Sequence, residues 1–210
     1  MPASVAAESA PVRRRVLDAA RDCFKRFGVV RTRIEDIAQA AGISRPLLYQ
    51  YFDGRQGLIA ALAEDEIERI IEENRKRLPV GAGFAETVVE GSLAAIDIGR
   101  SETLLADLFE ASTLDDLPSL LLDPTRPPYA AVSGLWKPVF DRARETGELR
   151  SDLSDADLIE WLASVHYAFL LRSDVDPKRQ RELFELFLVP ALLNGAPPPA
   201  PPKRSRRKSS

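Results

Sequence analysis

The sequence has very little of the chemistry that metal sites and nucleophilic enzymes need. Its 210 residues include one cysteine, Cys23, and one histidine, His166. A lone cysteine cannot form an internal disulfide, and a lone histidine leaves little from which to build a zinc site or a histidine-based triad. We therefore expect no catalytic residue, no metal and no cofactor.

Long uncharged apolar runs are also missing. Charged residues interrupt each apolar stretch well short of the roughly 18 residues that a membrane helix needs. The segment Met1–Pro11 lacks the hydrophobic centre of a signal peptide. These absences predict a cytoplasmic protein that does not associate with membranes.

Signals for β-strands are nearly absent as well. The chain shows no sustained alternation of apolar and polar residues and no Asn-Gly hairpin turn between two such segments, whereas most segments repeat apolar residues every three to four positions. Hydrophobic residues make up 45% of the chain, enough to bury a core. The sequence therefore predicts an all-α fold.

Charge is distributed unevenly along the chain. The net charge of −3 divides into +4 for residues 1–55, −12 for residues 56–202 and +5 for the tail 203–210. A basic N-terminal module on an acidic body indicates that one end of the protein meets a polyanion.

Periodicity and helix-end signals divide the chain into four parts. We expect a disordered N-terminal arm over residues 1–11, a first helical module over 12–56, a larger helical domain over 57–195 and a disordered, proline-rich basic tail over 196–210. The run from Asp115 to Pro128 is expected to be a partly apolar connection. The predicted helices are Val12–Phe27, Thr32–Ala41, Ser44–Phe52, Arg55–Leu78, Phe84–Gly99, Ser101–Ser112, Pro128–Thr146, Asp155–Leu171 and Pro177–Leu193.

The second and third predicted helices carry clear start and stop signals. Thr32 and Glu35 have the spacing of a capping box, in which a hydroxyl and a carboxylate cap each other's amides. Gly42 ends the second helix, Ser44 is a natural N-cap for the third, and Pro46 suits its first turn.

Two crossed helices around a tight turn need a small residue at the crossing and a glycine four positions later. Ala38 and Gly42 meet these needs. Apolar residues must also seal the pair against the first helix, and they occur at Ile37, Ala41, Ile43 and Leu48. The spacing therefore predicts a helix-turn-helix, although a helical hairpin without nucleic-acid function fits the same pattern.

The outward face of this unit favours nucleic-acid binding. It presents Arg45, Leu47, Tyr49 and Gln50 on the third helix, with Arg31, Thr32 and Arg33 beside the second. Arginine and glutamine can pair with purine edges, and tyrosine and helix N-termini can bind phosphate.

A family resemblance rests on the stretch from Val12 to Leu62. Its matching elements are Ala19-Ala20, Phe24, Gly28, Thr32, Asp36-Ile37-Ala38, Ala41-Gly42-Ile43-Ser44, Leu48-Tyr49 and Tyr51-Phe52. With these elements the segment resembles the TetR family of bacterial repressors, over about a quarter of the chain. The resemblance implies a homodimer whose third helix enters the major groove and whose fourth helix leads to a ligand-binding and dimerising domain.

The resemblance also implies roles for individual residues. Thr32, Tyr49, Tyr51 and Arg55 would contact phosphate, and Arg33, Arg45, Leu47 and Gln50 would approach base edges. Arg31, Ser44 and Pro46 complete the expected interface. Leu47 departs from the threonine common in the family, and Gly54 stands where a hydroxyl cap is common. Tyr51 and Leu47 can also be interpreted as packing residues.

In the larger domain the family offers architecture more than residue roles. The expected dimer interface lies on the last two helices, whose apolar stripes can equally be intramolecular core. A pocket for a small, lipophilic effector is expected among the middle helices. The expected DNA partner is a double-stranded, palindromic operator, and effector binding would change the spacing of the dimer's two helix-turn-helix units so that they no longer fit it. The candidate lining residues of the pocket, which can also be plain core, are Gly91, Ser92, Ala95, Phe109, Trp136, Phe140, His166 and Tyr167.

Two other functions compete with this interpretation. The carboxylates of Asp107, Glu110, Asp115 and Asp116 could serve an enzyme, although such clusters are usually solvated helix faces. The basic tail could belong to a non-specific architectural DNA-binding protein, or it could simply aid solubility. Repression rather than activation is implied by the resemblance alone.

Overall fold

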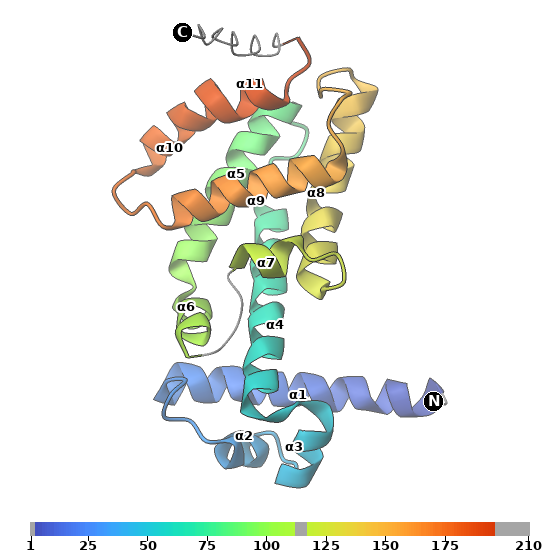
Figure 1. Ribbon diagram of the computed structural model, residues 1–210, viewed down its shortest axis with the longest axis vertical. Helices are drawn as coiled ribbons and strands as arrows, with labels where there is room; N and C mark the ends of the chain where they lie inside the picture. Colours follow the sequence, from blue (N-terminus) through green and yellow to red (C-terminus); the bar gives the residue numbers. More distant parts are fainter. Residues whose placement is uncertain (1–2, 112–116, 196–210) are drawn as a thin grey trace, which may run out of the picture.

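The protein, seen in a computed structural model that describes residues 3–111 and 117–195, is all-α in these ranges (Figure 1). Its only pairing of extended backbone within them is an isolated bridge between Leu149 and Leu193. The all-α prediction is therefore confirmed. None of the helices in these ranges is long and apolar enough to cross a membrane. The proline-rich tail 196–210, predicted to be disordered, lies outside the described residues.

The N-terminal module consists of α1 (Ala3–Phe27), α2 (Ile34–Ala40) and α3 (Arg45–Tyr51). Helix α1 begins at Ala3 rather than Val12, so the expectation of a disordered arm is wrong for residues 3–11. This stretch is rich in alanine, which has the highest helix propensity. Pro11, a residue typical of a first helical turn, lies inside the helix instead.

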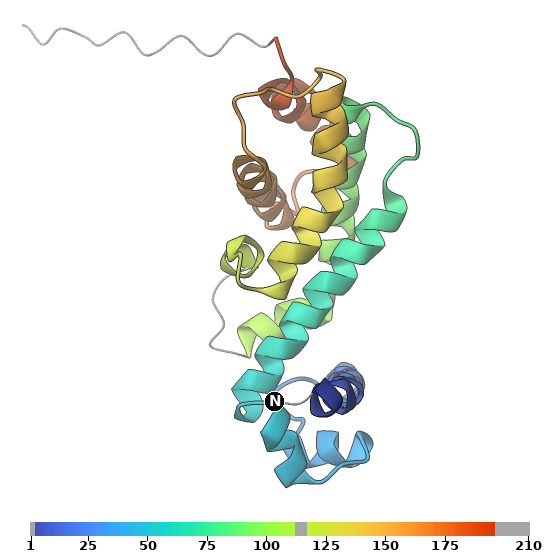
Figure 2. The ribbon, with the colours of Figure 1, turned by 90° about the vertical axis from the view of Figure 1, so that its right-hand side faces the viewer.

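A long helix, α4 (Gly54–Arg77), rises from this module into the larger domain (Figure 2). There it packs against α5 (Phe84–Ser101), α6 (Thr103–Glu110) and α8 (Pro127–Glu145), and α9 (Asp155–Leu170) crosses α5 and α8. The bounds of these helices agree with the predicted ones to within two residues.

Two segments of the larger domain differ from expectation. The expected connection after Asp115 contains a short helix, α7 (Leu117–Leu122), which buries Leu120 against α9. The expected final helix is divided into α10 (Pro177–Leu183), a π-helical turn η1 (Phe184–Leu188) and α11 (Val189–Leu192). Proline cannot donate to the carbonyl four residues back, and the wider turn lies immediately before Pro190, with Val189 donating to the carbonyl of Phe184.

One hydrophobic cluster runs through both domains. It extends from Val16 and Phe24 on α1, through the inner face of α4, to Trp136, Phe140 and Phe184 in the upper domain. Because α4 contributes Leu58, Ile59 and Leu62 to the lower part and Ile67 and Ile71 to the upper part, it couples the two domains mechanically.

A buried ion network also joins α1 to α4. The Arg21 side chain is 10% exposed and pairs with Asp18, Asp65 and Glu66, and the Glu66 side chain is only 2% exposed. Burial lowers the pKa of Arg21, but hydrogen bonds to Glu66 and Asp18 outweigh it and raise the pKa above its ordinary value. The guanidinium therefore stays charged and compensates a buried carboxylate.

Candidate nucleic-acid interface and effector pocket

The helix-turn-helix forms as the spacing predicts. Gly42 has a φ of +65°, a backbone conformation that residues other than glycine rarely adopt. The turn is closed by a hydrogen bond of 3.0 Å from the Ile43 N–H to the Ala38 carbonyl. Ile37, Ala38 and Leu48 are buried, so α2 and α3 seal against the rest of the module and leave their other faces free.

The third helix begins where the sequence predicts. The Ser44 hydroxyl accepts a hydrogen bond from the Leu47 N–H, and Pro46 lies in the first turn. Of the residues predicted to contact DNA, Leu47 and Tyr51 are half-buried, and Tyr51 packs against the core. Thr32 is buried and Arg55 is half-buried. The predicted DNA-contact residues that are exposed are Arg31, Arg33, Ser44, Arg45, Pro46, Tyr49 and Gln50.

Arg45 is held in place on this exposed surface. Its Nη1 atom lies 2.7 Å from Oε1 of Glu35 on α2, and its guanidinium lies over the Tyr49 ring, 5.5 Å from the ring centroid. The hydrogen bond to Tyr49 and the nearby charge of Glu35 raise the pKa of Arg45. The side chain is thus a permanent cation, oriented by two neighbours and open to an anionic or base-edge partner.

Thr32 does not start the second helix. The N-cap of α2 is Arg33, whose N–H donates to the Asp36 carboxylate at 3.1 Å. The Thr32 hydroxyl is buried and donates to the carbonyls of Gly28 and Cys23, at 2.8 and 3.3 Å. Thr32 therefore packs inside the module because its hydroxyl closes the turn after α1, and the predicted capping box with Glu35 is not formed.

Arg55 also serves the interior of the module. Its guanidinium donates to the carbonyls of Thr32, at 2.6 Å, and Val29, and it lies over the Phe24 ring. It thereby fastens the start of α4 to the loop after α1. Asp53 caps α4 without a side-chain hydrogen bond, and Gly54, at the position where a hydroxyl cap is common, has no side chain to supply one.

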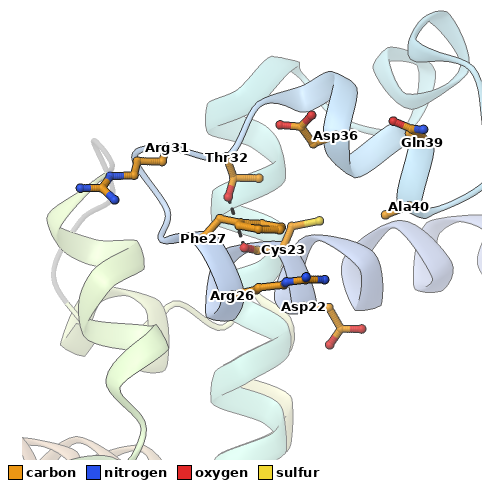
Figure 3. A pocket seen from close by; sticks show the side chains of 9 residues that line it. All are labelled: Asp22, Cys23, Arg26, Phe27, Arg31, Thr32, Asp36, Gln39 and Ala40. Atoms are coloured by element: carbon orange, nitrogen blue, oxygen red, sulfur yellow. Dashed lines mark hydrogen bonds between the residues drawn. The ribbon is translucent and has the colours of Figure 1, made fainter.

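An open groove lies between α1 and α2 beside this loop (Figure 3). Arg26 and Arg31 line it together with Asp22 and Asp36, so its charges are mixed. Figure 3 shows the Thr32 hydroxyl turned toward the Cys23 carbonyl. Burial raises the pKa of the Cys23 thiol, which keeps it protonated and unreactive near neutral pH.

A second cavity, of about 120 Å³ and less open than this groove, lies in the larger domain. Helices α4, α5, α8 and α9 supply most of its wall. Four of the predicted pocket residues line it: Ala95, Trp136, His166 and Tyr167.

The other four predicted pocket residues lie outside the lining. Gly91 faces the Trp136 ring and Leu78, which would lie 2.8 Å from an added Cβ atom. Phe140 is fully buried and stacks on Trp136, Ser92 is fully buried in α5, and Phe109 packs against the core from α6. Small or aromatic side chains at these positions fill the core, because the neighbouring helices occupy the space beside them.

Comparison with known proteins places the N-terminal module. Residues 16–62 match the profile of the bacterial regulatory proteins, tetR family. The N-terminal module is therefore similar to the helix-turn-helix module of the tetR family. The match covers the helix-turn-helix and the start of α4, which are the elements that present Arg45, Tyr49 and Gln50.

Two relatives of this chain come from Mycobacterium tuberculosis. The HTH-type transcriptional regulator AlkX is 29% identical over 135 residues, which are 64% of each chain. The HTH-type transcriptional repressor Rv1474c is 36% identical over 58 residues, 28% of this chain and 31% of that protein. The matched segments thus span less than two thirds of these relatives. Both are regulators and not enzymes, and Asp107 and Glu110 lie exposed on α6, as solvated residues do. Asp115 and Asp116 lie outside the described residues.

Solved structures agree on the fold. Thermus thermophilus FadR, described as a TetR family transcriptional repressor in complex with lauroyl-CoA, has a TM-score of 0.61 at 24% identity and covers 90% of this chain and 100% of its own. A TetR-family transcriptional regulator from Haemophilus influenzae has a TM-score of 0.57 at 13% identity and covers 89% of this chain and 99% of its own. The larger domain therefore has the architecture of TetR-family proteins.

Two residues that line the cavity each carry a buried polar atom with no hydrogen-bond partner among the described residues: Oδ1 of Asn74 and Nε2 of His166. The sequence interpretation did not include Asn74. Its signal was a polar residue in the apolar stripe of α4, after Ile67 and Ile71, where a hydrophobic residue is expected. The other lining residues are uncharged, so both polar groups sit in an apolar environment.

Burial of His166 predicts a pH-dependent stability. Burial lowers the pKa of His166 from 6.5 to about 4. Between pH 6.5 and about 4, His166 binds a proton in the unfolded chain but not in the folded chain. The free energy of unfolding therefore decreases as the pH falls through this window. From pH 7 to pH 5, wild-type protein should lose about 2 kcal/mol more unfolding free energy than His166→Gln, which cannot titrate. Urea unfolding at both pH values measures this difference, and equal losses in the two proteins would refute it.

Proposed function

We propose that this chain is a sequence-specific DNA-binding regulator of transcription that reads its operator with α3. The observation that carries the proposal is the exposed row of Arg45, Tyr49 and Gln50 on a helix held rigidly by the Gly42 turn and the Ser44 cap. These side chains can pair with base edges and phosphate, and α3 is free of the core on that face.

The proposed regulator is a homodimer that binds a palindromic operator. Trp161 on α9 is 48% exposed, and Leu186 and Phe187 on η1 are 60% and 68% exposed, although the same segments bury Leu162, Phe184 and Leu188. Exposed large apolar side chains on α9 and η1 are typical of an interface. A dimer formed through this surface would present two α3 helices, one for each half-site of a two-fold symmetric operator.

The proposed regulator is a repressor released by a small, lipophilic effector. The second cavity touches α4 along Ile67, Ile70 and Ile71, and α4 continues into the DNA-binding module. An effector that favours a different tilt of α4 would change the spacing of the two α3 helices, which must match successive major grooves about 34 Å apart. Repression has support from the descriptions of Rv1474c and Thermus thermophilus FadR as repressors.

Selection from random double-stranded DNA tests the proposal. Purified full-length protein should enrich a palindrome with half-sites about one helical turn apart, and light scattering should show a dimer at the concentrations used. The reading of α3 as a recognition helix would be contradicted by enrichment no greater than that of a non-specific binding control. A monomer that still selects a single half-site would contradict the dimer.

A further inference from the structure

The cavity between α4 and α9 combines an apolar wall with two unpaired polar atoms. Asn74 is only 3% exposed, and its Oδ1 atom has no hydrogen-bond partner among the described residues. Nε2 of His166 is enclosed and equally unpaired. Buried polar atoms in folded proteins nearly always have partners, so two such atoms on residues that line one small space favour a ligand that supplies their partners.

The size of the cavity limits that ligand. Its volume of about 120 Å³ is comparable with the roughly 150 Å³ of an engineered apolar cavity that binds benzene. A body about the size of one ring therefore fits the space as it stands, whereas a long acyl chain does not. The Trp136 ring, which lies 6.4 Å from the His166 ring between centroids, offers an aromatic face in the wall.

The chemistry of the wall limits the ligand further. The lining residues are uncharged at neutral pH, because burial keeps the His166 imidazole neutral by lowering its pKa to about 4. A charged ligand would lose its hydration there without a counter-charge. Asn74 Oδ1 can only accept a hydrogen bond, so the ligand must donate one, and a hydroxyl that gives its single hydrogen to Asn74 can still accept from His166 when Nε2 carries the hydrogen of the neutral ring.

We propose that this cavity binds a compact, neutral molecule with an apolar body about the size of one ring and a hydroxyl that donates to Asn74 and meets His166. This ligand class rests on the proposed function for its role as effector. Binding itself is independent of DNA. The hydroxyl satisfies atoms that an apolar ligand of the same shape leaves unpaired, so it sets the specificity of the site.

Two probes of nearly the same shape test the ligand class: phenol, which carries a hydroxyl, and toluene, which carries a methyl group in its place. Calorimetry on the full-length protein without DNA should show phenol binding at least about tenfold more tightly than toluene. Asn74→Leu, which keeps the side chain's approximate shape, should remove this preference by weakening phenol and sparing toluene. His166→Phe should reduce the preference as well.

Ser133→Ala is the matched control, because Ser133 also has a buried, unpaired hydroxyl but does not line the cavity. It should leave both affinities unchanged. The inference is overturned if toluene binds wild-type protein as tightly as phenol, if Asn74→Leu leaves the preference intact, or if phenol does not bind. Calorimetry without DNA tests only the ligand class, and selection from random DNA tests only the proposed regulator. Either proposal can therefore fail while the other holds.

Discussion

Replacing Arg21 with methionine is expected to lower the free energy of unfolding by about 3 kcal/mol. The substitution keeps an apolar stem of similar length but leaves the Glu66 carboxylate, 2% exposed, without its principal buried partner. Arg69 remains near Glu66 at 3.0 Å, but its side chain is 47% exposed and its charge is screened by water. Asp18 and Asp65 would then repel Glu66 without the guanidinium between them.

Urea unfolding measures this loss, and thermal unfolding should show a melting temperature lower by roughly 6 to 12 °C. The double variant Arg21→Met, Glu66→Met is the informative control, because replacing a buried ion pair with apolar residues is often nearly neutral. It should recover most of the lost stability. Equal destabilisation of the single and double variants would show that packing, and not an uncompensated charge, governs this contact between α1 and α4.

The DNA-binding module could be predicted closely because its signals are local. Gly42 is required by a positive φ, and Ser44 and Pro46 act within one helical turn of their own positions. Such signals depend only on neighbouring residues. The sequence therefore predicts the bounds of α2 and α3 to within two residues, and it predicts that Arg45, Tyr49 and Gln50 face outward.

Side chains that act across the fold were harder to predict. Thr32 looks like a helix cap and Arg55 like a phosphate ligand, yet both bond to backbone carbonyls of the loop after α1. Whether a hydroxyl or a guanidinium faces solvent or the loop depends on how α1 and α4 cross. That crossing is a tertiary property with no local signal.

The cavity illustrates the same limit. Trp136 and Phe140 are both aromatic residues on one face of α8, yet only Trp136 reaches the cavity because Phe140 stacks behind it. Asn74 was overlooked because a single polar residue in an apolar stripe has no meaning until the neighbouring helices enclose it. The π-helical turn before Pro190 likewise follows from a backbone conflict that periodicity does not reveal.

Helix α3, the proposed recognition helix, carries the second large effect. Replacing Arg45, Tyr49 and Gln50 together with alanine should weaken operator binding at least about 100-fold, since each well-placed contact to a base edge contributes about 1–3 kcal/mol and a dimer makes each contact twice. All three side chains are exposed, so the fold should persist with little change in unfolding free energy. Arg142→Ala, which removes an exposed arginine from α8 in the larger domain, controls for lost charge.

Operator affinity relative to a shuffled sequence is the most direct measure of whether α3 reads DNA. Wild-type protein and Arg142→Ala should prefer the selected operator strongly over its shuffled counterpart. The triple variant should bind both sequences with the same weak affinity, because only non-specific phosphate attraction remains. A folded triple variant that kept the wild-type preference for the operator would contradict the assignment of α3 as the reading helix.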